Sequence, residues 1–171
     1  FILNMATLAV DDNDTISRTA VSADLMALAG IGYIPIWGFY RGELETDGPL
    51  DELADLRGRR VSFGEPDSGT RALSRLLLSA SDLTEHDFTV VDAAPDASAE
   101  MLLRGEIDAM FLVSGITSPT IMRLGTAPDV QLLNLRLAPT YARMIAQLHN
   151  VDLLEGSFSI GAPSPPETKQ L

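Results

Sequence analysis

Cysteine is absent from this chain of 171 residues. Disulfides, cysteine-ligated zinc and thiol catalysis are therefore excluded, and a cysteine-free chain suits an oxidising compartment. Long apolar stretches are absent too, because no run in the sequence reaches the roughly 18 apolar residues that a membrane-spanning helix needs. The chain is nevertheless 46% hydrophobic, which is enough to bury the core of one ordinary domain.

Basic charge is scarce. The chain has 12 Lys and Arg residues against 24 Asp and Glu residues, which gives a formal net charge of −12. A nucleic-acid-binding protein needs a basic surface that displaces counterions from phosphates, and no basic stripe is visible here. We therefore expect no nucleic-acid partner, and we interpret the densest basic stretch, residues 57–60, as the solvated edge of a strand.

Patterns for catalysis and metal binding are also missing. His86 and His149, the only histidines, are far apart in the sequence and lack metal-type spacing, so we expect both on the surface. Residues 11–14 offer oxygen ligands without the glycine and closing glutamate of an EF-hand loop, which favours a turn or a cap. No nucleophile elbow is present in the sequence. The sequence thus predicts a protein that is not an enzyme and that carries no cofactor or metal.

Strand-like and helical patterns alternate through the middle of the chain. The strand-like runs are 61–64, 88–92, 107–113 and 130–135, and the helical patterns are 70–81, 97–105, 119–125 and 139–148. The run 107–113 is almost unbroken in apolar residues, as expected for a strand covered on both faces. Strands separated by helices of about ten residues indicate βαβ units, so we predict an α/β block with a mostly parallel sheet over residues 53–137.

Spacing within two of these helices predicts which side chains face the core. In the second helix the pattern places Ala97, Met101 and Leu102 inward, and Gly105 stands in the position of a C′ glycine. In the last helix the predicted apolar face consists of Tyr141, Met144, Ile145 and Leu148.

The first 50 residues do not continue the alternation. Residues 5–10 are typical of a strand, residues 24–29 of a short helix, and residues 43–51 of an acidic link. Residues 32–41 form an extended segment that carries four of the ten aromatic side chains of the chain. Because Pro35 has no N–H for a β-ladder, we expect this strand at a sheet edge or between two sheets.

The turn at residues 64–71 carries the most suggestive chemistry. Its sequence, Gly-Glu-Pro-Asp-Ser-Gly-Thr-Arg, places Ser68 at a helix N-cap and Gly69 where a ligand can approach the backbone. The free N–H groups of the first helical turn, with Thr70 among them, accept a carboxylate, phosphate or sulfate, and Arg71 can add a bidentate donor pair. The alternative is a plain helix cap. A nucleotide-hydrolysing phosphate loop is not expected, because its lysine is missing.

Four further residues are candidates for ligand contact. Ser114 and Gly115 follow the buried strand, at the end where parallel sheets present ligands, although such a pair also makes ordinary turns. Trp37 and Tyr40 can stack on a ligand or bond to it, although aromatic side chains in such a segment also serve as core.

The order of these motifs resembles the TAXI family, the extracytoplasmic solute receptors of TRAP-type transporters. The resemblance rests on residues 55–61 (Asp-Leu-Arg-Gly-Arg-Arg-Val), the turn 64–71, residues 102–109 (Leu-Leu-Arg-Gly-Glu-Ile-Asp-Ala) and residues 113–115 (Val-Ser-Gly). It covers residues 33–137 well and the flanks loosely. One departure is Asp67, where family members usually have glycine, and its carboxylate opposes an anionic ligand by like-charge repulsion.

The resemblance implies a type 2 periplasmic-binding-protein fold. Residues 53–137 then form a three-layer αβα lobe two, residues 1–52 the end of lobe one and the crossover between lobes, and residues 138–171 a return toward lobe one. It implies an organic acid or amino acid as ligand, held by Ser68, Gly69 and Thr70 near Ser114 and Gly115. It also implies the permease subunits of a TRAP-type transporter as partner and a periplasmic location.

Two functions remain open from the sequence. The first is capture of a small solute by lobe closure and its delivery to a membrane permease. The second is a sensor or regulatory domain of the same fold, such as the effector domain of a transcription regulator or a receptor ectodomain. The flanking sequence discriminates: a secretion signal supports the first, a helix-turn-helix the second, and a downstream membrane span an anchored receptor.

Overall fold

A five-stranded sheet forms the centre of the computed structural model, which describes residues 9–10, 16–17, 34–45, 50–146, 148–161 and 163–171. The strand order is β5-β4-β6-β3-β7. The strands are β3 (Ile36–Arg41), β4 (Arg60–Ser62), β5 (Thr89–Val90), β6 (Ala109–Val113) and β7 (Val130–Leu132). β4 is parallel to β5 and β6, whereas β3 is antiparallel to both β6 and β7. All strands except β3 therefore run in one direction, which confirms the mostly parallel α/β prediction.

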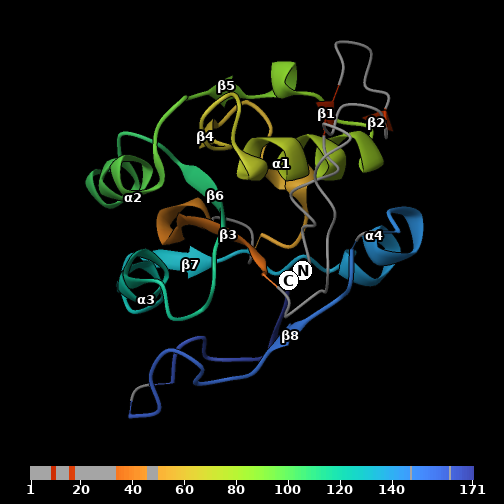
Figure 1. Ribbon diagram of the computed structural model, residues 1–171. Helices are drawn as coiled ribbons and strands as arrows, with labels where there is room; N and C mark the ends of the chain where they lie inside the picture. The colour runs from red at the N-terminus through yellow and green to blue at the C-terminus, as the bar shows by residue number, and fades with distance from the viewer. Residues whose placement is uncertain (1–8, 11–15, 18–33, 46–49, 147, 162) are drawn as a thin grey trace, which may run out of the picture.

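Helices cover both faces of the sheet, so the predicted three-layer αβα arrangement is confirmed (Figure 1). α1 (Gly69–Ala80) and α4 (Ala138–Met144) pack on one face, and α2 (Pro95–Arg104) and α3 (Pro119–Gly125) on the other. Side chains along a strand point alternately to the two faces of the sheet, so one strand contributes to both cores. In β3, Ile36 and Tyr40 join the α1–α4 core, while Trp37 and Phe39 join the α2–α3 core.

The position of β3 corrects our expectation for the aromatic segment. β3 lies inside the sheet between β6 and β7, not at an edge. Pro35 precedes the first strand residue, so its missing N–H costs no ladder bond, and its carbonyl accepts a hydrogen bond from Ser114 N at 3.3 Å. Residues 32 and 33 of the predicted segment lie outside the described residues.

Gly105 ends its helix as the sequence predicts, but the helix predicted over residues 139–148 ends at Met144, and two inward assignments are wrong. Gly105 ends α2 in the left-handed conformation, with φ of 73°. Ala97 is exposed because the buried face of α2 centres on Ser98, Ala99 and Leu102. Met144 is 62% exposed because α4 ends there, and the chain continues extended before Leu148 is buried.

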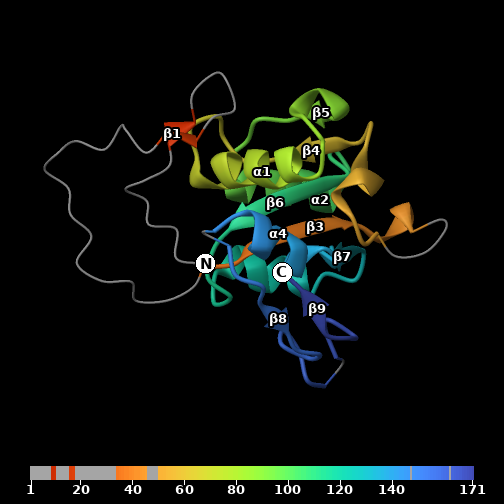
Figure 2. The same cartoon turned by 90° about the vertical axis from the view of Figure 1, so that its right-hand side faces the viewer.

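The last 20 residues pack against the α2–α3 face. β8 (Asp152–Leu153) and β9 (Lys169–Gln170) form an antiparallel pair, which Figure 2 shows beneath the sheet, on the side opposite α1. Phe158 contacts the Trp37 ring at a centroid distance of 5.8 Å, and a Cβ on Gly125 would lie 2.5 Å from the Phe158 ring. The division into lobe segments at residues 52 and 137 stays a prediction.

Short elements complete the described chain. A two-stranded pair joins β1 (Ala9–Val10) to β2 (Ile16–Ser17), and 3₁₀ turns lie at η1 (Gly42–Leu44), η2 (Leu53–Leu56) and η3 (Glu85–Asp87). Of the predicted strand 5–10 only the last two residues are described, and the predicted turn at 11–14 and helix at 24–29 lie outside the described residues. The link 43–51 is described only in part.

Candidate functional site

The carboxyl ends of β4, β5 and β6 lie together, and each leads into the N-terminus of a helix. β4 leads to α1, β5 to α2 and β6 to α3. The antiparallel β3 begins at this same end, since Ile36 pairs with Val113, the last residue of β6. We call this side the carboxyl end of the sheet, and the opposite side, where these parallel strands begin, the amino end. Ligands of open α/β sheets bind at carboxyl ends.

The turn between β4 and α1 presents backbone donors there. Gly64 has φ of 88°, and a Cβ at this position would lie 2.7 Å from Ser68 Oγ, so the turn requires glycine. Ser68 caps α1: its hydroxyl accepts a hydrogen bond from Arg71 N at 3.1 Å and donates to the Glu65 carbonyl at 2.8 Å. The N–H groups of Gly69 and Thr70 bond to no acceptor within the described part of the chain. Both donors therefore stand at the positive end of the α1 dipole.

Thr70 joins this turn to β6. Its buried hydroxyl accepts a hydrogen bond from Val113 N at 3.1 Å, one residue before Ser114. The structure thus places Thr70 against the end of β6, one residue before Ser114. A site shared by residues 68–70, Ser114 and Gly115 stays a prediction. Ser114 is half-buried, and Gly115 is exposed with open space where a side chain would project.

Arg71 is occupied inside the chain. Its Nε and Nη2 bond to the two Glu85 oxygens at 2.5 and 3.0 Å, and its Nη1 bonds to Asp92 at 2.7 Å and to the Gly64 carbonyl at 3.1 Å. Burial lowers the pKa of Arg71, but hydrogen bonds to Glu85 and Asp92 outweigh it and raise the pKa above the ordinary value. The donor pair that we assigned to a ligand is therefore taken by Glu85. No sequence pattern identified Glu85 or Asp92, because they lie 14 and 21 residues away.

Trp37 and Tyr40 are core side chains, the alternative that the sequence left open. Trp37 is 0% exposed and Tyr40 1% exposed, on opposite faces of the sheet. The Tyr40 hydroxyl donates to Glu45, and burial, followed by this bond, raises the Tyr40 pKa. Trp37 still touches the site from within, because its Nε1 donates to the Ser114 carbonyl at 2.8 Å.

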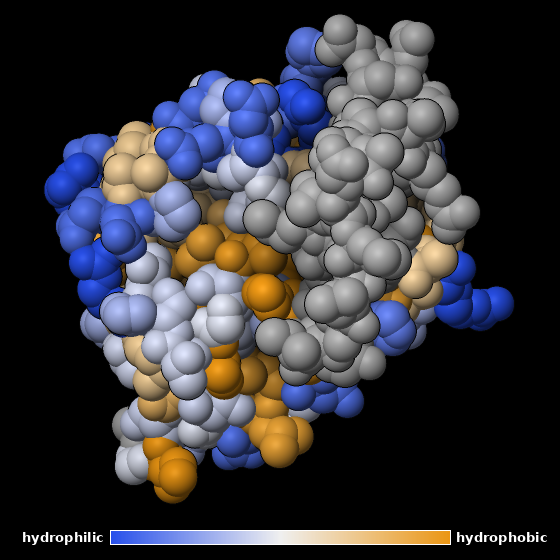
Figure 3. Space-filling model, in the orientation of Figure 1, coloured by the Kyte–Doolittle hydropathy of each residue, from blue (hydrophilic) through white to orange (hydrophobic). Residues whose placement is uncertain are grey.

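Charge and apolar surface also lie at the carboxyl end. Asp67 is exposed on the turn, and its carboxylate forms no ion pair within the described part of the chain. Its opposition to an anionic ligand stays a prediction. Ile34 and Ile116 are 43% and 39% exposed. Figure 3 shows hydrophobic side chains exposed in a hollow at the centre of this view, between α1 above and α3 below.

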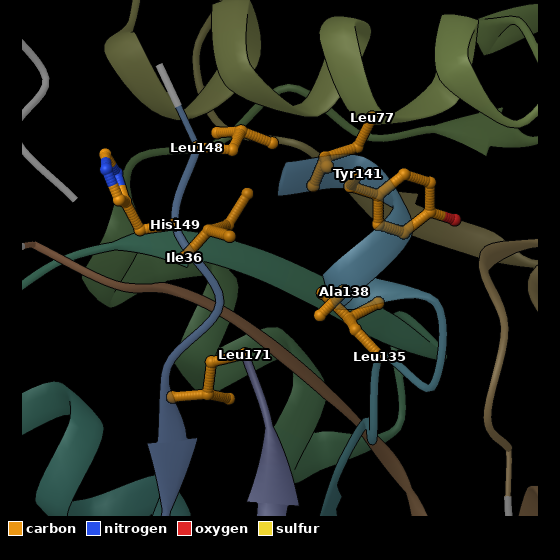
Figure 4. Close-up of a pocket in the computed structure, with 8 residues that line it drawn as sticks. All are labelled: Ile36, Leu77, Leu135, Ala138, Tyr141, Leu148, His149 and Leu171. Atoms are coloured by element: carbon orange, nitrogen blue, oxygen red, sulfur yellow. The ribbon is translucent and has the colours of Figure 1, made fainter. Parts of the chain in front are cut away.

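A small apolar cavity between α1 and α4 is too small to hold a solute. Its volume is about 10 Å³, room for one water at most. Figure 4 shows its lining side chains, and Tyr141 directs its hydroxyl away from the cavity, where it bonds to Ser81 Oγ at 2.8 Å. The remaining lining residues are Ile36, Leu77, Leu135, Ala138, Leu148, His149 and Leu171.

The described residues form neither a metal cluster nor a membrane-spanning helix. Among the described residues, no group of three His, Asp or Glu side chains could hold a metal ion. In the described ranges no helix is long and apolar enough to cross a membrane. His86 and His149 are both exposed, as expected, and so are residues 57–60.

The chain is similar to known proteins both in sequence and in fold. A model of the NMT1-like family matches residues 23–154. Among solved structures, the alkanesulfonate-binding protein SsuA from Xanthomonas axonopodis pv. citri, bound to MOPS, is similar with 21% identity and a TM-score of 0.47 over 60% of this chain. The aliphatic sulphonate binding protein SsuA from Escherichia coli has 19% identity and a TM-score of 0.46 over 57% of this chain. A periplasmic binding protein from Brucella ovis with glutathione bound has 11% identity and a TM-score of 0.45 over 58% of this chain.

The chain corresponds to only part of these structures. The matches cover 34%, 29% and 30% of the respective solved chains.

Proposed function

We propose that this chain, which belongs to the NMT1-like family, supplies one side of the ligand cleft of an extracytoplasmic solute-binding receptor. One observation supports the proposal: among the described residues the N–H groups of Gly69 and Thr70 have no acceptor, and the Thr70 hydroxyl holds their turn against β6, one residue before Ser114. These groups are fixed by the Ser68 cap and by the Thr70–Val113 bond, so they need no rearrangement to receive a ligand.

The solute bears one small anionic group, a carboxylate in our first assignment. Two neighbouring backbone N–H groups at a helix N-terminus bind one anionic oxygen group, and in this proposal the Ser114 hydroxyl adds a third donor. The exposed Asp67 carboxylate limits the favourable charge for such a group, so an amino acid whose ammonium pairs with Asp67 fits better than a multiply charged acid. Ile34 and Ile116 offer apolar contact beside it.

The receptor serves a membrane transporter. In this proposal residues 53–137 form lobe two, and closure of a second lobe over the carboxyl end excludes water and retains the solute. The resemblance to TAXI receptors supports the permease of a TRAP-type transporter as the partner that takes the solute. The second candidate function is a sensor domain of the same fold, which the same unbonded donors at the carboxyl end support equally. Sequencing of the flanking gene regions discriminates the two.

Isothermal titration of the full-length protein tests the proposal. The titrants are L-glutamate, succinate, ethanesulfonate and L-arginine. The decisive variant is Gly69→Pro, because proline is well tolerated at the first helical position and removes only that N–H. Ser68 already has the extended backbone, with ψ of 153°, that a following proline requires.

We expect the variant to bind about tenfold more weakly, since one hydrogen bond to a charged group is lost. Gly69→Ala, which keeps the N–H, is the matched control and should lose less. Absence of binding by the wild-type protein to all four titrants, or unchanged affinity in Gly69→Pro, would contradict the proposed function.

A further inference from the structure

We propose that Arg71 is a positioning residue: it holds the solute-binding turn in place through Glu85 and Asp92 and does not itself contact the solute. This inference rests on the proposed function and assigns a role to the ion-pair cluster around the buried Arg71. The cluster consists of Arg71, Arg75, Glu85 and Asp92.

The geometry places Arg71 at both ends of the turn. Its main-chain N–H donates to the Ser68 hydroxyl, and its side chain reaches back to the Gly64 carbonyl at 3.1 Å. The same guanidinium is held from outside by Glu85 in η3 and by Asp92, which follows β5. One side chain therefore ties together the turn, η3 and the loop before α2. If the guanidinium moves, the Gly64 carbonyl is released, and the N–H groups of Gly69 and Thr70 lose their fixed direction.

Charge and burial argue against a direct contact with an anionic solute. Arg71 is 6% exposed, and its Nε and both Nη atoms already donate hydrogen bonds. Arg75 also pairs with Glu85 at 2.8 Å, so the cluster holds two cations and two carboxylates. An anionic solute that took the guanidinium would have to displace a carboxylate and leave it partly buried without its partner, which is costly.

The two roles predict opposite results for the carboxylate partners. If Arg71 contacted an anionic solute, then Glu85→Gln and Asp92→Asn would release donors and leave binding unchanged or tighter. If Arg71 positions the turn, both variants loosen it and weaken binding about fivefold to tenfold, and either of them combined with Arg71→Lys loses less than the product of the single losses. Asp92→Asn is the milder variant, because the Asp92 side chain is 53% exposed. Glu106→Gln is the matched control, since Glu106 forms an exposed bidentate pair with Arg104 at the amino end.

The experiment measures two quantities on the full-length protein and its variants. Titration with L-glutamate and with ethanesulfonate gives affinity, and hydrogen–deuterium exchange of the peptide 64–71 reports the turn without any solute. We expect faster exchange of this peptide in Glu85→Gln and Asp92→Asn, unchanged exchange in Glu106→Gln, and unchanged exchange of the peptide 119–125 throughout.

The outcomes separate the two proposals. If the turn exchanges faster in Glu85→Gln and Asp92→Asn while the wild-type protein binds none of the four titrants named above, the role of Arg71 in the turn is supported and the proposed function is overturned. Unchanged exchange in both carboxylate variants, or affinity that is equal or tighter in them, overturns the positioning role while a binding wild type leaves the proposed function intact.

Discussion

The two ends of the sheet are built from the same residue types but finish their strands differently. At the amino end, the Arg60 guanidinium bonds to Asp108 at 2.6 and 3.1 Å and to the carbonyls of Gly105 and Glu106 at 3.0 and 2.7 Å. Asp108 also accepts from the Arg60 main-chain N–H at 2.8 Å. At the carboxyl end Arg71 is buried and pairs with Glu85 and Asp92. Two backbone donors there, Gly69 N–H and Thr70 N–H, stay unbonded within the described residues.

This difference supports the proposal that the carboxyl end binds the solute. At the amino end Arg60 satisfies two carbonyls directly after α2, those of Gly105 and Glu106, together with the Asp108 carboxylate. Among the described residues, the carboxyl end holds two backbone donors without a partner, which supports the proposed ligand site. Breaking each end should therefore have different consequences: loss at the amino end affects stability alone, and loss at the carboxyl end affects stability and binding together.

The largest expected effect comes from Gly64→Ala. The positive φ and the 2.7 Å contact with Ser68 Oγ force the turn to shift, so the free energy of unfolding should fall by roughly 2–3 kcal/mol. Urea unfolding measures this loss, and L-glutamate titration should show weaker binding. Gly115→Ala is the control, because nothing lies within 4 Å of its Cβ position and its stability should stay within about 0.5 kcal/mol of wild type. Equal stability of the two variants would refute the strained turn.

Thr70→Val should have the next largest effect. The valine keeps the shape but removes the acceptor of the Val113 N–H, which costs about 2 kcal/mol for an unsatisfied, mostly buried donor. Thr70→Ser, which retains the hydroxyl, should lose clearly less. Thermal or urea unfolding of both variants measures the two losses of stability. Equal, small losses in Thr70→Val and Thr70→Ser would show that the hydroxyl has no structural importance.

Ser68 distinguishes capping from binding. Ser68→Ala should lower the free energy of unfolding by about 1 kcal/mol, because the Arg71 N–H loses its cap. Ser68→Asp should restore the cap and the stability but weaken L-glutamate binding, since its negative charge stands beside the Gly69 and Thr70 donors. Urea unfolding and titration of both variants measure the split, and Ser68→Asp that binds as tightly as wild type contradicts an anion site at this turn.

Acid should reveal the smallest effect. Burial raises the pKa of Glu85, but hydrogen bonds from Arg75 and Arg71 outweigh it and hold the pKa below its usual value. Its contribution is therefore present above about pH 4.5 and is lost as the pH falls through the lowered pKa. Glu85→Gln should flatten the decline of stability below that pH, by about 0.5–1 kcal/mol after solvent screening.

Asp108 provides the same test at the amino end. The hydrogen bond from the Arg60 side chain, ahead of the opposing effect of burial, lowers the pKa of Asp108. Asp108→Asn should flatten the decline of stability in acid, as Glu85→Gln does. It should leave the hydrogen–deuterium exchange of the peptide 64–71 unchanged. Glu65→Gln removes an exposed carboxylate from the turn and so controls for the loss of one negative charge. Unfolding curves at stepped pH values measure these slopes.

Local patterns predicted the helices and the α/β class well, because each depends on neighbouring residues. The helix over residues 119–125 has the predicted bounds, and Gly105 and Ser68 end and begin their helices as expected. Thus capping chemistry and apolar spacing are readable from the sequence.

Pairing between distant residues was not predictable from these patterns. The insertion of β3 between β6 and β7 depends on contacts with residues about 70 to 100 positions later, and an isolated proline suggested an edge instead. The candidate site shows the same limit. The sequence predicted the Ser68 cap, but the ion pairs of Arg71 with Glu85 and Asp92 and the burial of Trp37 arise from tertiary packing.

The hydrogen bond between Trp37 and Ser114 gives the chain an optical reporter. Trp37 is its single tryptophan, fully buried against Phe39 and Phe158, with its indole N–H on the backbone of the proposed cleft. Indole emission depends on the dipoles near the ring, so a solute that polarises the Ser114 peptide changes the fluorescence without entering the core. Solute screening of this chain can therefore be followed by intrinsic emission, with no label and no change to the binding surface.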